Sequence, residues 1–212
     1  MKGRAGIKGL VGKLFLAVAL TFSGSDSVRA EPSNYKVDAP SGTHYFMDSH
    51  RDALVWTEFE NGLGDIVVWH PDSGEQKITD DNYDQCSPSM SGNNIVWTDF
   101  RNGNPDIYMW DSVNGERPIC TDPSRQSNPS IWNNQITWFD DRSGETEVYR
   151  AEIEPRFPDL NSDGIVDMGD YAILVGALGN TGFGLPEDLN DDYIVNSGDL
   201  GVLARDWLEE VD

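Results

Sequence analysis

Two twelve-residue stretches near the C-terminus carry oxygen side chains at the spacing that a calcium loop uses. The first runs from Asp159 to Asp170, and the second runs from Asp188 to Asp199. In such a loop, positions 1, 3, 5, 9 and 12 supply side-chain oxygens and position 7 supplies its backbone carbonyl. Two such loops in tandem predict two calcium sites. The predicted ligands are Asp159, Asn161, Asp163, Ile165, Asp167, Asp170, Asp188, Asn190, Asp192, Ile194, Asn196 and Asp199.

The residue at position 6 distinguishes the two loops. Gly164 occupies it in the first loop, whereas Tyr193 occupies it in the second. The backbone turns sharply at this position, and glycine is the residue that makes this turn without strain. We therefore expect calcium to bind more weakly at the second loop than at the first.

A proline precedes each loop, and an apolar segment of helix length follows it. Pro158 and Pro186 disfavour helix just before the loops, whereas residues 171–178 and 200–208 are suited to helices that leave them. Each unit is therefore predicted to be a loop with a single departing helix. An intracellular calcium sensor has helices on both sides of its loop, so this class of protein is not indicated.

The duplicated loop–helix unit resembles a type I dockerin over residues 159–208. This resemblance implies that structural calcium holds the module together and that a cohesin-like protein is its partner. Family members contact that partner through loop positions 10 and 11, which are Met168-Gly169 and Ser197-Gly198 here. These pairs differ from the Ser-Thr that is frequent in the family.

Upstream of the loops, a tryptophan-centred segment recurs at a constant spacing. Trp56, Trp97 and Trp138 occupy equivalent positions of three units, and they are expected to be packing residues. Within a unit, runs of β-branched and aromatic residues alternate with turns rich in Gly and Asn, which predicts four short strands. A period of about 40 residues with four strands is typical of the blade of a β-propeller.

The segment 87–111 resembles the blade repeat of TolB-type propellers, and the resemblance extends over residues 42–153. The predicted fold class is mainly β, with about three four-stranded blades followed by a small α-helical calcium loop–helix domain. Closed propellers have about four to eight blades. A short or truncated family member, a ring closed by several copies of the chain and an open three-blade array are all consistent with the sequence.

The segment 1–30 is predicted to be a secretory signal peptide. Basic residues precede an apolar run at 14–22, and a small-x-small cleavage site ends at Ala30. The run is too short to span a bilayer, so we expect a secreted or cell-surface protein. The other predicted divisions are a polar leader at 31–41, the repeats at 42–153, a linker at 154–158 and the loop–helix domain at 159–212.

The chain is strongly acidic, with a formal net charge of −22 at neutral pH. Such a charge repels nucleic acid and anionic membranes, so neither is expected as a partner. The two cysteines, Cys86 and Cys120, are in neither a CxxC motif nor a Cys/His cluster, which argues against zinc and thiol chemistry. Export would permit a disulfide between them, but the sequence does not show whether they pair.

Acidic residues recur at equivalent positions of the repeats, for example Glu58, Asp99 and Asp140. A residue present in every unit is expected to make a turn or strand-end hydrogen bond, because catalysis needs one asymmetric constellation. Trp69 and Trp110 each end a strand, where they could stack on a sugar ring, although packing is the expected role. No catalytic residue is predicted.

The sequence favours a secreted, non-catalytic calcium-binding protein. Its propeller-like domain would recognise a glycan or a protein, and its dockerin-like module would attach it to a cohesin-type partner or the cell surface. The alternative is a component or fragment of a polysaccharide-degrading enzyme, a hydrolase of O-glycosyl bonds, because dockerin relatives usually accompany glycoside hydrolases. A homo-oligomer that closes the propeller is a further expectation.

Overall fold

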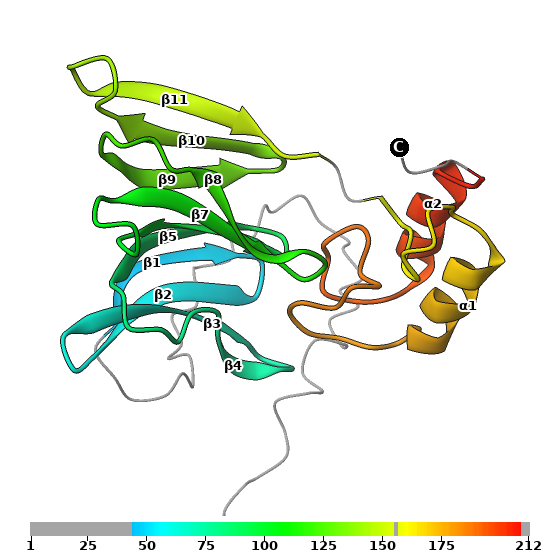
Figure 1. Ribbon diagram of the computed structural model, residues 1–212. Coiled ribbons are helices and arrows are strands. Elements are labelled where there is room, and N and C mark those ends of the chain that lie inside the picture. Colours follow the sequence, from blue (N-terminus) through cyan, green and yellow to red (C-terminus); the bar gives the residue numbers. More distant parts are fainter. Residues whose placement is uncertain (1–43, 155–156, 209–212) are drawn as a thin grey trace, which may run out of the picture. The chain divides into compact units, whose positions relative to one another are not determined.

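The computed structural model describes residues 44–154 and 157–208. Three antiparallel sheets follow one another along the chain, and two helices come after them (Figure 1). The predicted signal peptide and polar leader lie outside the described residues. None of the helices in the described segments has the length and apolar character needed to cross a membrane.

The first two sheets each contain four strands in chain order. The first sheet consists of β1 (His44–His50), β2 (Ala53–Glu60), β3 (Leu63–His70) and β4 (Gly74–Lys77). The second consists of β5 (Gln85–Ser91), β6 (Asn94–Asp99), β7 (Asp106–Asp111) and β8 (Gly115–Cys120). These are the four-stranded units that the tryptophan-centred repeat predicts.

The third sheet has three strands among the described residues, one fewer than the repeat predicts. It consists of β9 (Gln126–Trp132), β10 (Gln135–Asp140) and β11 (Glu147–Glu152). The equivalent of β8, one repeat further along the chain, would fall at 156–161. That segment contains Pro158, which has no N–H to donate to a ladder, and the start of the first loop.

The three sheets, which we call blades 1, 2 and 3, pack face to face. One core cluster joins blades 1 and 2 and includes Val55, Ile66 and Trp97, all at most 1% exposed. A second joins blades 2 and 3 and includes Met109 and Trp138. Trp56 is likewise buried, at 1% exposed, so the three recurrent tryptophans are packing residues, as predicted.

Side-chain hydrogen bonds connect the first strands of neighbouring blades. Asp48 on β1 accepts hydrogen bonds from Ser89 Oγ at 2.8 Å and from the backbone N–H of Met90 at 3.0 Å. One blade further, the N–H of Asn133 donates to Ser91 Oγ at 3.0 Å. These bonds hold the turns after β1, β5 and β9 at one end of the blades.

The outward face of blade 3 differs from the equivalent faces of blades 1 and 2. Val68 and Met109 are at most 1% exposed because the next blade covers them. The equivalent residue in blade 3 is Arg150, whose side chain is 69% exposed, and the neighbouring Val148 is 68% exposed. This face is exposed to solvent and carries a charged side chain where blades 1 and 2 carry a buried apolar one.

Both helices begin inside the predicted loops, ahead of the predicted starts at 171 and 200. They are α1 (Met168–Ala177) and α2 (Ser197–Arg205). Asp167 and Asn196, at loop position 9, are the N-caps, and each forms a capping box with the aspartate at position 12. The capping box satisfies backbone N–H groups at the helix start, which explains the early starts.

Candidate functional site

The two loops have the same internal hydrogen-bond frame. In the first loop, Asp170 Oδ1 accepts from the N–H groups of Leu160 and Asn161 at 2.7 and 3.1 Å, and Asp170 Oδ2 accepts from Asp167 N at 2.8 Å. In the second loop, Asp199 makes the equivalent three bonds at 2.8, 3.1 and 2.7 Å. Asp170 and Asp199, at position 12, are both fully buried. The aspartate at position 12 therefore links the start of each loop to its helix.

The position-1 aspartates close the loops from the other side. Asp159 accepts from the N–H groups of residues 163 and 164 at 3.2 and 2.9 Å, and Asp188 accepts from those of residues 192 and 193 at 3.0 and 2.8 Å. Position 6 is in the left-handed region in both loops, with φ of 92° at Gly164 and 68° at Tyr193. The second loop thus makes the same turn without a glycine.

The two halves of the module are bonded reciprocally. At the end of α1, the N–H of Gly179 donates to the carbonyl of Val195 in the second loop at 2.8 Å. At the end of α2, the N–H of Leu208 donates to the carbonyl of Val166 in the first loop at 2.9 Å. Both valines are fully buried in one core cluster with Leu174 of α1. Each loop therefore supports the helix of the other half.

The twelve predicted ligands lie in these two loops, but their carboxylates do not converge on one centre. Across residues 44–154 and 157–208, no three or more His, Cys, Asp or Glu side chains are gathered closely enough, in their present positions, to hold a metal ion. The carboxylates are instead directed at backbone N–H groups. The donor set contains only oxygens from Asp, Asn and a backbone carbonyl, which is the set that Ca²⁺ prefers. The residues fit calcium in type and order, and side chains would turn inward to bind it.

The second loop is in contact with the blades, which sequence reasoning missed. Asn93, in the turn between β5 and β6, donates from Nδ2 to Asp188 Oδ2 at 3.2 Å and to Asp191 Oδ1 at 3.0 Å. The adjacent Gly92 leaves no room for a side chain, because a Cβ there would lie 2.5 Å from Asp191 Cβ. A predicted position-1 ligand is thus held by a blade.

Tyr193 is the centre of this contact. Its side chain is 3% exposed and belongs to the core cluster of blades 1 and 2, together with Phe183. Its ring lies 5.0 Å from that of His70, and its hydroxyl donates to the carbonyl of Gly92 at 3.1 Å. Burial raises the pKa of this hydroxyl, so it stays protonated and able to donate. The tyrosine at position 6 is the sequence signal for this contact, although a non-glycine residue there indicates only strain when the loop is considered alone.

Negative charge accumulates at the second loop. Burial raises the pKa of Asp188 above its usual range, and the carboxylates of Asp191 and Asp199 add to this effect. Hydrogen bonds from the backbone of Tyr193 and Asp192 act in the opposite direction. A cation at this loop would relieve the repulsion, since an opposite charge favours the ionised form of a carboxylate.

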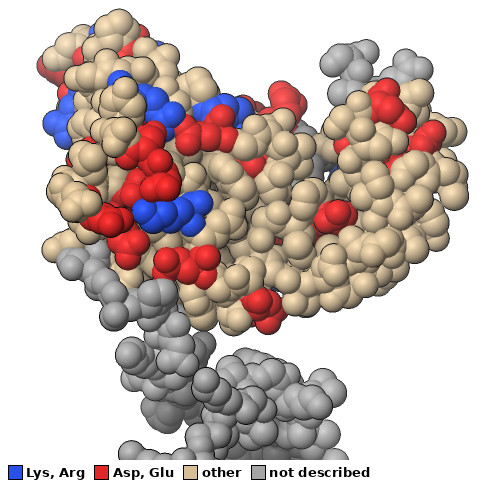
Figure 2. Space-filling model, turned by 60° about the horizontal axis from the view of Figure 1, so that its bottom comes forward, with Lys and Arg blue, Asp and Glu red and all other residues tan. Residues whose placement is uncertain are grey.

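On the blades, by contrast, acidic side chains have basic neighbours (Figure 2). Lys77, for example, lies within 3.6 Å of carboxylates on Glu60, Asp65 and Asp80. The pairs with Glu60 and Asp80, whose side chains are 68% and 79% exposed, contribute little to stability. They do show that the acidity of the blades is partly compensated locally, whereas Arg205 is the only basic residue after Arg156.

The recurrent acids of blades 2 and 3 are structural, as expected. Asp99 accepts from Trp97 Nε1 at 2.9 Å and from Arg101 Nη2 at 2.6 Å, and the Arg101 guanidinium lies 4.3 Å from the ring of Tyr108. Asp140 makes the same contacts with Trp138 and Arg142. Both aspartates are fully buried. The pattern Trp-x-Asp-x-Arg was visible in the sequence and could have identified this arrangement.

Blade 1 lacks this arrangement. Glu60 replaces the arginine, and Val67 replaces the tyrosine. The Nε1 of Trp56 is buried and has no partner among the described residues. The acid at this repeat position, Glu58, therefore has a different environment from its counterparts.

The residues considered for other chemistry have packing or local roles. Trp110 stacks on Phe183 with ring centroids 5.5 Å apart, which agrees with the expected packing role and leaves that face unavailable to a sugar. Cys86 and Cys120 are not bonded to each other. Cys120 Sγ accepts a hydrogen bond from Arg142 Nη2 at 2.9 Å.

Comparison with known proteins identifies the fold of the repeat part. Neither a protein-family model nor a curated protein matches the sequence. The β-propeller domain of the trilobed protease from Pyrococcus furiosus is similar, with a TM-score of 0.50 and 12% identity over 58% of this chain and 42% of that one. A putative TolB from Agrobacterium tumefaciens is similar, with a TM-score of 0.46 and 13% identity over 55% of this chain and 47% of that one.

The chain spans less than half the length of these two structures. At this identity, the likeness to the Pyrococcus domain concerns the fold alone. Together with the four-stranded antiparallel sheets, it shows that the repeat part of this chain is built of β-propeller blades.

Proposed function

We propose that this chain is an exported calcium-binding protein whose C-terminal dockerin-like module docks a cohesin-like partner. The observation that carries the proposal is the duplicated loop frame, in which position 12 of each loop is a buried aspartate that caps the departing helix. A single N-cap side chain suffices for capping, whereas each loop here also has oxygen side chains at positions 1, 3 and 5. The export signal is proposed from residues 1–30 of the sequence.

Calcium is proposed at both loops, through the twelve ligands named above. Its role would be structural, because gathering the carboxylates of one loop is unfavourable until a cation neutralises them. The second site is proposed to be weaker, since Tyr193 holds a left-handed conformation at φ 68°. Such a conformation costs a residue with a Cβ about 1–2 kcal/mol.

The partner is proposed to dock on α1. Met168, Tyr171, Val175 and Leu178 follow one another at helical spacing and are 62%, 39%, 39% and 44% exposed. An exposed apolar stripe of this kind is typical of a protein-binding surface. The equivalent positions at and after α2 are Ser197, Leu200, Ala204 and Trp207. The two large apolar side chains among them, Leu200 and Trp207, are partly buried. The first half of the module therefore offers the larger apolar surface.

The blades are proposed to be a recognition domain without catalytic activity. Asp99 and Asp140 are engaged by Arg101 and Arg142, which favours a structural role for the repeated acids. The alternative, a component of a glycoside hydrolase, rests on the usual company of dockerins. Hydrolysis of polysaccharide by the purified chain would support that alternative.

The docking proposal is tested with type I cohesin domains as probes. The immobilised full chain should retain at least one of them in calcium and release it in EDTA. The double variant Tyr171→Ala, Val175→Ala should lose this retention. Val148→Ala, which removes a still more exposed apolar side chain (68%) from blade 3, should not. Retention that EDTA leaves unchanged, or no retention of any cohesin in calcium, would contradict the proposal.

A further inference from the structure

Trp132 is the one exposed tryptophan of the seven in this chain, all of which lie in described segments. It ends β9, and its side chain is 72% exposed. The equivalent residues of blades 1 and 2 are His50 and Ser91, so the ring is not a remnant of the repeat pattern. Water contact with so large an apolar ring is unfavourable. Of the three blades, blade 3 alone has a tryptophan at this repeat position. An asymmetric feature of this kind indicates a local role.

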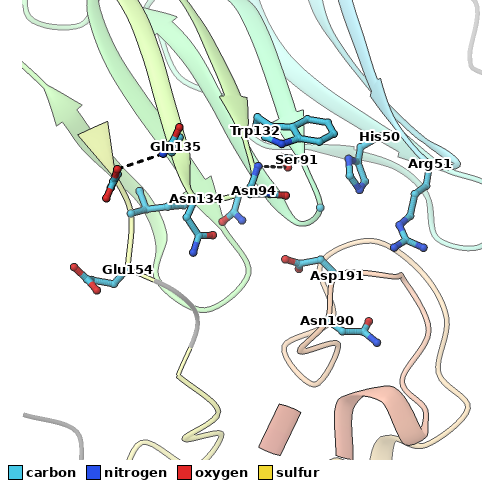
Figure 3. Close-up of a pocket in the computed structure, with 14 residues that line it drawn as sticks. His50, Arg51, Ser91, Asn94, Trp132, Asn134, Gln135, Glu154, Asn190 and Asp191 are labelled. Atoms are coloured by element: carbon cyan, nitrogen blue, oxygen red, sulfur yellow. Dashed lines mark hydrogen bonds between the residues drawn. The ribbon is translucent and has the colours of Figure 1, made fainter. Parts of the chain in front are cut away.

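A cavity of about 770 Å³ lies beside Trp132. Three equivalent turns line it, those that follow β1, β5 and β9, and the second loop faces them (Figure 3). In this view Trp132, His50 and Asn94 come from the blades, whereas Asn190 and Asp191 come from the loop on the opposite side. The volume is within the range of sites that hold a small organic ligand.

Side-chain amides dominate the polar lining of this cavity. Asn94, Asn134, Gln135 and Asn190 all line it. The amides of Asn94 and Asn134 make no hydrogen bond to any other described residue, so both are available to a ligand. An amide offers two donors and an acceptor, which match a hydroxyl group that must both donate and accept.

The charges around the cavity disfavour an anionic ligand. Glu152, Glu154 and Asp191 line it, against the single basic residue Arg51. Burial and the nearby Arg51 lower the pKa of His50, so its imidazole is uncharged at neutral pH. Phosphates and uronic acids would meet a net negative surface here. The polar lining likewise disfavours a purely apolar ligand.

We propose that this cavity binds a neutral saccharide chain, with one sugar ring stacked on the indole of Trp132. The C–H face of a sugar ring is apolar and matches an indole, while its hydroxyl groups match the surrounding amides. Asn94 and Asn134 bind hydroxyl groups, while Arg51 from the turn after β1 and Asp191 from the second loop also border the ligand. This inference rests on the recognition role proposed above for the blades and names the class of ligand and its site.

The test is a titration of the full chain, in a calcium-containing buffer, with neutral β-linked hexasaccharides of glucose, xylose and mannose. Tryptophan fluorescence is the readout, and hexagalacturonate is the anionic comparison. At least one neutral sugar should shift the emission to the blue, because binding covers Trp132. Trp132→Ala should lower the affinity at least about tenfold, which corresponds to about 1.4 kcal/mol. Trp132→Phe, which keeps a ring, should lose less.

Phe139→Ala is the matched control. Phe139 is an exposed aromatic residue on the neighbouring β10, 44% exposed and outside the lining of the cavity, so its variant should bind sugar normally. A second variant, Asn94→Ala with Asn134→Ala, should weaken binding without changing the thermal unfolding midpoint. Equal binding by Trp132→Ala and the unaltered chain would overturn the proposal, as would tighter binding of hexagalacturonate.

Two further outcomes also count against the saccharide. One is the absence of a fluorescence change with every neutral sugar. The other is a Trp132-dependent capture of peptides from a peptide array by a chain that binds no sugar, which would make the cavity a peptide site. Failure here is distinguishable from failure of the docking proposal, because cohesin retention is read at α1 and depends on calcium.

Discussion

Replacement of Tyr193 by glycine should uncouple the loop–helix module from the blades. The side chain is 3% exposed, packs against His70 and Phe183, and donates to the carbonyl of Gly92 at 3.1 Å. Removal of a buried aromatic ring costs about 3–5 kcal/mol. Glycine would recover about 1 kcal/mol by relieving the left-handed conformation. The expected net loss in the free energy of unfolding is therefore about 2–4 kcal/mol.

Urea denaturation followed by two signals measures this uncoupling. Tryptophan fluorescence reports mainly on the blades, which contain six of the seven tryptophans, and far-UV circular dichroism at the helix band reports on the module. In the unaltered chain the shared core should make the two transitions coincide. In Tyr193→Gly they should separate, because the module keeps its own core around Leu174 and Leu203.

Two variants serve as controls for this experiment. Ile194→Ala changes the neighbouring residue, which is 45% exposed, and should alter the unfolding free energy by less than about 0.5 kcal/mol. Tyr193→Ala retains the strain and should be about 1 kcal/mol less stable than Tyr193→Gly. Coincident transitions with an unchanged midpoint in Tyr193→Gly would refute the reasoning that this residue joins the two parts.

Three other outcomes are expected. Burial acts to raise the pKa of Asp140, but hydrogen bonds from Arg142 and Trp138 outweigh it and lower the pKa from 3.8 to about 2. The stabilisation it gives is therefore present above about pH 4 and lost as the pH falls towards 2, and Arg142→Met should flatten that part of a curve of urea midpoint against pH. Arg150→Met places an apolar side chain where blades 1 and 2 have one, and it should make a monomeric chain associate in sedimentation experiments. Association of the unaltered chain would contradict the view that the outward face of blade 3 is a free surface. Asn93→Ala should weaken calcium binding at the second loop about tenfold in calorimetry, since residues that orient a ligand affect affinity on this scale, whereas Asn134→Ala, its counterpart in blade 3, should not.

The repeat architecture could be predicted because its determinants are local. Alternating apolar residues and Gly/Asn turns specify hairpins, and one constant period relates Trp56, Trp97 and Trp138. The strand pairing in blades 2 and 3 agrees with this period, since Trp97 lies opposite Tyr108 and Trp138 lies opposite Tyr149. The expected fourth strand of blade 3 is not found among the described residues, because the segment 157–161 contains Pro158 and the start of the first loop.

The contact between module and blades could not be predicted in the same way. Tyr193 and Gly92 are 101 residues apart, and no periodicity relates them. Position 6 of the second loop suggested strain, but the reason for a tyrosine there is the blade core around it. The predicted helix starts, 171 and 200, are later than the observed ones, and the reason is local. Apolar periodicity marks the packed turns, whereas the first turn is set by the capping residues Asp167 and Asn196.

Calcium calorimetry on the full chain tests the central proposal most directly. Two ions should bind per chain, the second more weakly. Asp170→Asn should abolish the tighter of the two binding events, and Asp199→Asn the weaker, because each aspartate closes one loop. Saturable binding of two ions with this pattern of loss is the predicted result. The absence of saturable binding at millimolar calcium, or binding that both variants retain in full, would contradict it.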